Sequence, residues 1–166
     1  MAMKDALLPE FDHEVAVTRK VLERVAEDKF AWQPHEKSMS LGRLATHLAE
    51  TPEFGLSILG EPEFNMIPGS HVPKAPRTLA ETLAMFAATT KKVRGLLAGM
   101  SDAELMNTWR FKRDGKEMFA MPRAAAWRGW VMSHMIHHRG QLSVYLRQTG
   151  SKVPSIYGPS ADEQPA

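Results

Sequence analysis

Four stretches of this sequence carry apolar residues at the three- and four-residue spacing of an amphipathic helix, and this pattern constrains the fold most strongly. The stretches cover residues 5–25, 40–59, 78–99 and 122–150. The second is expected to kink or break at Pro52, which has no backbone N–H to donate to the Leu48 carbonyl. Long amphipathic helices bury their apolar faces against one another. The sequence therefore predicts an all-α fold, a four-helix bundle.

The segments around these helices differ in kind. Residues 60–77 contain four prolines, which predicts a loop long enough to be functional. Residues 108–119 alternate around Asp114-Gly115, which predicts a small β-hairpin before the last helix. Residues 151–166 show no periodicity and are expected to wrap on the surface. We therefore expect one bundle domain over residues 1–150, followed by a C-terminal tail over residues 151–166.

Composition excludes several kinds of function. The 21 basic and 19 acidic side chains are spread along the chain, so charge gives no support for binding to nucleic acid or to a membrane surface. No apolar run is long enough for a membrane span, and we expect a cytoplasmic protein. Cysteine is absent, which excludes disulfides, thiolate metal sites and a cysteine nucleophile. Any thiol chemistry would need a thiol supplied by a substrate.

The last predicted helix contains a stretch of five residues, 134–138, that holds three of the seven histidines. His134 and His138 lie one helical turn apart and point the same way, so both imidazoles can reach one metal ion. His137 is rotated by about 60° and is a flanking candidate. Zinc proteases that use this spacing carry a glutamate directly after the first histidine, whereas Met135 stands there in this chain. This difference excludes a protease.

Two histidines do not complete a metal site. His47, on the helix predicted over residues 40–59, lies at the edge of an apolar face and is the third candidate ligand. The alternatives are that the last helix carries its histidines on a partly exposed surface by coincidence, and that His47 is a hydrogen-bonded core residue.

Several motifs together carry a family resemblance. They are Trp32-x-Pro34, Leu44-Ala45-Thr46-His47-Leu48, His134-x-x-x-His138-Arg139-Gly140-Gln141-Leu142 and Leu146-Arg147-x-x-Gly150. In this order and spacing they resemble the DinB/YfiT-like family over nearly the whole chain. The resemblance implies a four-helix bundle, often dimeric, that holds one divalent metal ion with a histidine triad. By motif position the triad is similar to His47, His134 and His138.

The resemblance also implies a chemistry. Characterised relatives are transferases or isomerases that use small thiols such as bacillithiol or mycothiol. We therefore expect a metal-dependent transferase or isomerase with a low-molecular-weight thiol cosubstrate, a small-molecule substrate and a homodimeric assembly. Zinc is the expected ion, and all-nitrogen ligation also accommodates nickel, iron or copper.

The residues that would assist such a site are less well defined by the sequence, and no catalytic residue is assigned. Glu50, one turn after His47, is a candidate general base or additional ligand, or else a solvated surface carboxylate. Gln141 could orient an imidazole or a bound water, or be an ordinary polar helix residue. His137 and His71 are candidate proton shuttles near the mouth of the site.

Two other functions stay open at this point. In the first, the protein is a stress-response binding or structural module in which the metal is not catalytic. In the second, it is a metal-free bundle that dimerises through an apolar helix face.

Overall fold

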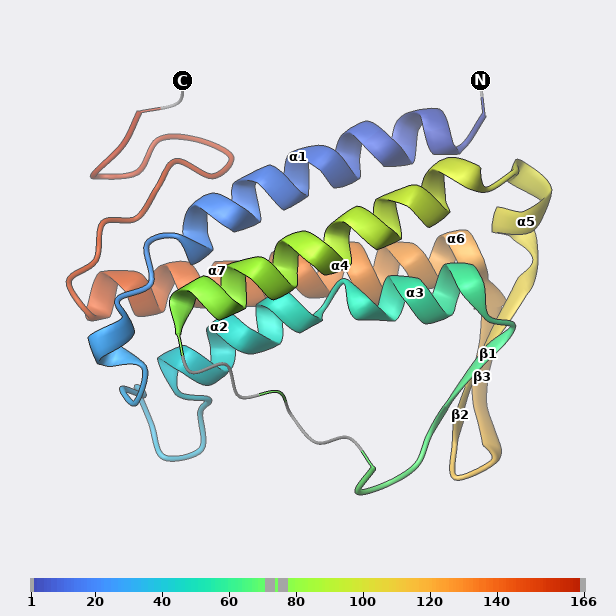
Figure 1. Ribbon diagram of the computed structural model, residues 1–166, viewed down its shortest axis with the longest axis horizontal. Coiled ribbons are helices and arrows are strands. Elements are labelled where there is room, and N and C mark those ends of the chain that lie inside the picture. Colours follow the sequence, from blue (N-terminus) through green and yellow to red (C-terminus); the bar gives the residue numbers. More distant parts are fainter. Residues whose placement is uncertain (1, 71–73, 75–77, 165–166) are drawn as a thin grey trace.

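The computed structural model describes residues 2–70, 74 and 78–164 (Figure 1). Its longer helices are α1 (Lys4–Leu22), α2 (Leu41–Glu50), α3 (Glu53–Gly60), α4 (Leu79–Gly99) and α7 (His134–Gln148). Shorter elements are η1 (Glu27–Lys29), α5 (Asp102–Met106), α6 (Arg123–Ala126), η2 (Trp127–Ser133) and the strands β1 (Glu63–Met66), β2 (Thr108–Arg113) and β3 (Lys116–Pro122). None of the helices in the described part of the chain is both long and apolar enough to cross a membrane.

The helices form the predicted four-helix bundle. Helix α1 packs against α4 and α7, the α2–α3 pair packs against α4, and α2 also packs against α7 (Figure 1). The apolar stripe of α2 faces inward, and Leu41, Leu44 and Leu48 are almost fully buried. Ser40 and Thr78 are N-caps, because each accepts a hydrogen bond from a backbone N–H in the first turn of its helix. The fold class is therefore confirmed.

The second predicted helix is broken as expected at Pro52. Helix α2 ends at Glu50 and α3 begins at Glu53. Pro52 has no N–H, and the Thr51 hydroxyl donates to the His47 carbonyl oxygen over a distance of 2.9 Å. The break places His47 in the last turn of α2 and lets α3 leave at a different angle toward the sheet.

The predicted hairpin is present and belongs to a three-stranded sheet. Asp114 and Gly115 have positive φ angles of 51° and 76°, as a two-residue hairpin turn requires. Strand β1 pairs in parallel with β2, with Phe64 opposite Phe111. The prediction of a loop over residues 60–77 is therefore wrong at β1. This strand has only four residues, and its order comes from pairing with a distant segment rather than from local propensity. Residues 71–73 and 75–77 of that loop lie outside the described residues.

The last predicted helix is divided into three parts. Helix α6 and α7 are joined by η2, a π-helical segment. The wider π turn changes the phase between the start of the helix and His134, so helix arithmetic across residues 127–133 is unreliable, whereas it holds within α7. Gly150 has a φ of 81° and follows the last helical turn, as predicted.

The residues after α7 follow the surface, and a buried ion pair anchors them. Arg139 is 1% exposed and pairs with Glu14 of α1 at 2.6 Å. The Tyr157 hydroxyl donates to the Glu14 carboxylate at 2.8 Å and accepts a hydrogen bond from Arg139. Arg139 thus has a structural role, joining α1, α7 and the segment after it.

At Gly55, helix α3 lies close to Val93 of α4 and to the Trp127 ring. A Cβ atom there would lie 2.7 Å from Val93 Cγ1 and 3.2 Å from the Trp127 ring. Gly55→Ala is therefore expected to lower the free energy of unfolding by about 1–3 kcal/mol.

Gly95→Ala on α4 is the matched control. No atom lies within 4 Å of its new Cβ, so it should raise the free energy by up to about 1 kcal/mol. Denaturant unfolding measures both, and equal effects would contradict this packing.

Candidate metal centre

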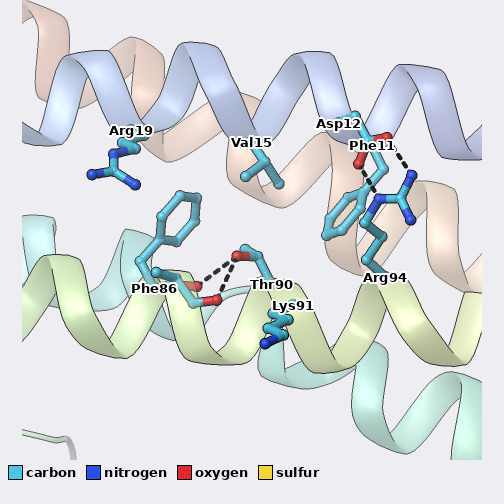
Figure 2. A pocket seen from close by; sticks show the side chains of 9 residues that line it. Phe11, Asp12, Val15, Arg19, Phe86, Thr90, Lys91 and Arg94 are labelled. Carbon is cyan, nitrogen blue, oxygen red and sulfur yellow. Dashed lines mark hydrogen bonds and ion pairs between the residues drawn. The ribbon is translucent and has the colours of Figure 1, made fainter.

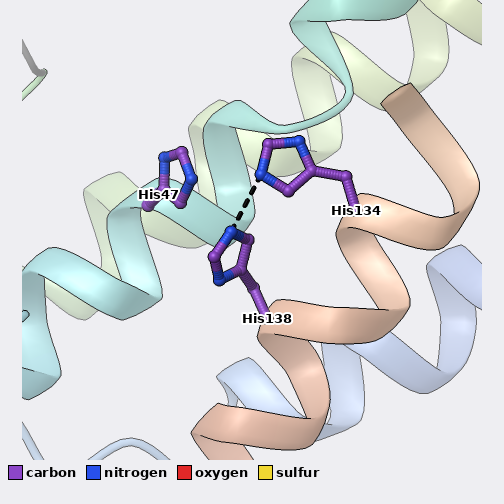
Figure 3. A group of neighbouring side chains, drawn as sticks. All are labelled: His47, His134 and His138. Atoms are coloured by element: carbon purple, nitrogen blue, oxygen red, sulfur yellow. Dashed lines mark hydrogen bonds between the residues drawn. The ribbon is translucent and has the colours of Figure 1, made fainter. Parts of the chain in front are cut away.

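The three predicted histidines lie together where α2 packs against α7. One ring nitrogen from each of His47, His134 and His138 lies within 4.8 Å of the others (Figure 3). Figure 3 shows His47 on α2 facing the two imidazoles of α7. The ring centroids are 4.5 Å apart for His47 and His138, and 5.2 Å apart for His47 and His134. His47 and His134 are 87 residues apart in the sequence, and the packing of α2 on α7 brings them together.

Hydrogen bonds orient the two imidazoles of α7. His138 Nδ1 lies 2.8 Å from Gln141 Oε1, an acceptor, so Nδ1 carries the proton and the Nε2 lone pair faces the site. The ring of His134 hydrogen bonds to the backbone of Trp130. The two Nε2 atoms face each other at 2.8 Å. Gln141 therefore lies where it can orient the His138 imidazole.

Burial keeps all three imidazoles neutral at pH 7. The pKa of His47 is lowered to about 4, mainly by burial and to a smaller extent by the neighbouring His138 and His134. Burial is also the main cause that lowers the pKa of His134 and of His138 below the usual value near 6.5. Neutral imidazole is the form that binds metals, so little proton competition is expected at neutral pH.

The donor set fits a divalent transition-metal ion. Zinc–nitrogen bonds of about 2.0–2.1 Å in tetrahedral geometry separate two ligand nitrogens by about 3.3 Å, which lies between the 2.8 Å and 4.8 Å found among these three rings. His47 Nδ1 is buried and has no hydrogen-bond partner. A buried polar atom without a partner is unfavourable, and an ion or a proton acceptor at this point would relieve it.

Glu50 is buried, so the alternative in which it is a solvated surface carboxylate is wrong. Its side chain is 7% exposed and lies 3.8 Å from His47 Nδ1, measured to Oε2. The Arg43 guanidinium donates to Oε2 at 2.9 Å, and the backbone N–H of Lys74 donates to Oε1 at 2.8 Å. These contacts hold a negative charge beside His47.

Of the other two candidates, only His137 belongs to the described residues, and it is not one of the three converging histidines. His137 is exposed, and its ring is 4.9 Å from that of His138 on the outer side of α7. His71 lies outside the described residues, so its predicted role as a proton shuttle is not addressed.

The sequence did not predict the pocket that adjoins the histidines. It has a volume of about 790 Å³, and His47 and Glu50 form part of its wall. Phe54 of α3 connects the two features, because its ring lies 5.8 Å from that of His134 and 6.3 Å from that of Phe64. The other apolar lining residues are Leu56, Phe64, Met66 and Phe111. Trp130 packs on Phe54 and Phe111 at the edge of this aromatic group.

A second and smaller pocket lies between α1 and α4. It has a volume of about 300 Å³ and is lined by Phe11, Val15 and Phe86 among others (Figure 2). Arg94 donates to both carboxylate oxygens of Asp12 at its rim. None of the predicted site residues lines this pocket.

A helical bundle in which two helices bring three neutral imidazoles together defines a class of candidate metal-binding proteins. The model of the DinB family matches residues 1–165, and the chain belongs to this family. Bacillus subtilis YrdA is 26% identical over 161 residues, which cover 96% of this chain and 90% of YrdA.

Solved structures show the same fold. A DinB-like protein from Bacillus cereus ATCC 10987 superposes with a TM-score of 0.74 at 21% identity, covering 94% of this chain and 98% of that one. YfiT from Bacillus subtilis, described as a probable metal-dependent hydrolase with an unusual four-helix bundle topology, superposes with a TM-score of 0.60 at 18% identity. That match covers 90% of this chain and 89% of YfiT.

Proposed function

We propose that this protein is a metal-dependent enzyme in which His47, His134 and His138 hold one divalent ion, with zinc as the expected ion. The observation that carries the proposal is the convergence of three neutral imidazole nitrogens beside a pocket large enough for a small molecule. Sites with three protein ligands and an open position are typical of catalytic rather than structural zinc.

The proposed reaction is transfer of a small thiol to a substrate in the pocket, or a thiol-dependent isomerisation. A divalent ion on three neutral ligands keeps its full charge and would favour the deprotonated, nucleophilic form of a thiol or a water molecule. Gln141 fixes the orientation of His138. Glu50 places a negative charge beside His47 and is already engaged by two donors, so we assign it a positioning role.

Hydrolysis is the second candidate, because YfiT is described as a probable metal-dependent hydrolase. A turnover screen of the metal-loaded protein with electrophilic acceptors, with and without small thiols, separates the two. Product formed only when thiol is present supports transfer. Product formed equally without thiol supports hydrolysis. If no acceptor is turned over with or without thiol, the protein is better explained as a binding module.

Removing the metal is expected to abolish turnover while leaving the bundle folded. His47 and His134 are only partly buried, and the hydrophobic core is built from aliphatic and aromatic side chains on all the long helices. Chelation should therefore keep the helical circular dichroism signal and lower the melting temperature only by the amount that ligand binding contributes. Unfolding on chelation would instead show that metal binding drives folding, as expected for a structural site.

Gln141→Ala is expected to weaken zinc binding by about 10–100-fold, because His138 loses the acceptor that fixes its Nδ1 proton. Gln148→Ala, an exposed glutamine at the end of the same helix, is the matched control and should leave the affinity unchanged. Competition against a chromophoric chelator measures both variants. Equal affinities for the two would remove the orienting role of Gln141.

A further inference from the structure

The pocket beside the histidines has an aromatic and aliphatic interior. Phe64 of β1 and Phe111 of β2 stack at a centroid distance of 6.0 Å, and Phe54 of α3 meets Phe64 edge-on. Leu56 and Met66 complete the apolar wall. A concave apolar surface of this size is suited to burying the body of a small molecule.

Within the described part of the chain, the polar residues in the wall of the pocket are acidic or neutral. Four glutamates line it, and no lysine or arginine is among its described lining residues. Three of these glutamates form ion pairs: Glu50 with Arg43, Glu53 with Lys74, and Glu63 with Lys112. Glu61, the fourth, has an exposed side chain with no ion pair to any described residue. Unpaired among the described residues, the Glu61 carboxylate leaves a negative charge at the rim, which disfavours anionic ligands there.

One polar atom in the wall has no partner. Ser57 Oγ is buried without a hydrogen bond in the described structure, and Ser57 lines the pocket. Buried hydroxyls are normally hydrogen bonded, so this hydroxyl marks the point of the wall where a neutral polar group of a ligand would satisfy it. Phe54, which contacts both His134 and Phe64, would place that ligand next to the histidine group.

We propose that this pocket selects an uncharged substrate with an aromatic or branched apolar body and excludes anionic molecules of the same shape. The proposal rests on the proposed function only in placing the reactive end of the substrate beside the three histidines. Binding of the apolar body is a property of the pocket and does not require the metal.

A matched pair of fluorescent probes tests the charge selectivity. Phenylnaphthylamine is uncharged, and anilinonaphthalenesulfonate carries the same rings with an added sulfonate. Titrated into the metal-free protein, the uncharged probe should bind at one site per chain and about tenfold more tightly than the sulfonate. Equal binding of the two, or tighter binding of the sulfonate, would overturn the proposal.

Substitutions locate the probe. Leu56→Trp fills the pocket and should abolish binding, whereas Val15→Trp makes a similar change in the groove between α1 and α4 and should not. The reverse result would overturn the proposal. Glu61→Lys keeps the apolar interior and should reduce the preference for the uncharged probe by about threefold. Glu36→Lys makes the same charge change at an exposed residue away from the pocket and should leave the preference unaltered.

Loading with copper(II) tests the position next to the histidines. The ion should quench the bound uncharged probe in the wild-type protein but not in His134→Ala, where the probe still binds. Strong probe binding without quenching in a protein that has bound copper would place the ligand elsewhere. If no metal binds but the probes behave as stated, the proposed metal-dependent function fails and the pocket assignment stands.

Discussion

Replacing any one of His47, His134 and His138 by alanine is expected to weaken zinc binding by about 100-fold or more. Each variant leaves two imidazoles where the folded chain brings three together within 4.8 Å, and a water molecule replaces a nitrogen ligand. The His47 variant is the most informative of the three, since it tests whether the site extends from α7 to α2. Competition titrations of the metal-free proteins at pH 7.5 measure the effect.

His137→Ala is the matched control, because it removes an exposed imidazole from the same helix. Its zinc affinity should stay within about twofold of the wild-type value, because the His137 ring packs against that of His138 but contributes no nitrogen to the group of three. A loss of affinity as large as that of His134→Ala would make His137 a ligand and contradict the assignment. Full affinity in His47→Ala would restrict the site to α7.

Arg139→Ala is expected to lower the free energy of unfolding by about 3–5 kcal/mol. The substitution leaves the Glu14 carboxylate buried without its guanidinium partner, and it removes a donor to Thr18 and to Tyr157. For a chain of this length, the melting temperature should fall by about 10 °C. Chemical and thermal unfolding measure the two quantities.

The double variant Glu14→Leu with Arg139→Met shows whether the stability loss in Arg139→Ala comes from the unpaired Glu14 carboxylate or from lost side-chain packing. Replacing both members of a buried pair by apolar residues is often close to neutral, so we expect at least half of the stability to return. The zinc affinity of both variants should match that of the wild type, since Arg139 lies on the face of α7 away from the histidines. A stability loss below about 1 kcal/mol in Arg139→Ala would contradict the structural role of this residue.

Local patterns in the sequence were sufficient to predict the bundle and half of the site. The stripe of Leu41, Leu44 and Leu48 identified the buried face of α2, and the four-residue spacing of His134 and His138 is preserved because both lie within the regular helix α7. His47 was added through the motif in which it stands, and the packing of α2 on α7 brings it to the other two.

Features that depend on distant segments were not predictable in the same way. Strand β1 is too short to carry a pattern and is ordered by its pairing with β2. The burial of Glu50 depends on Arg43 and on the backbone of Lys74, which lies 24 residues further along the chain. The pocket likewise needs α3, β1 and β2 together, although the alternation of Phe64 and Met66 with polar residues is a signal that could have indicated a strand.

The metal content of the untagged protein tests the central claim most directly. Purified without an affinity tag and passed over a desalting column, the wild-type protein should contain about one divalent transition-metal ion per chain by elemental analysis. The triple variant His47→Ala, His134→Ala, His138→Ala, prepared in parallel, should contain almost none. A wild-type protein that neither carries nor takes up metal, or a triple variant that retains the wild-type amount, would contradict the account.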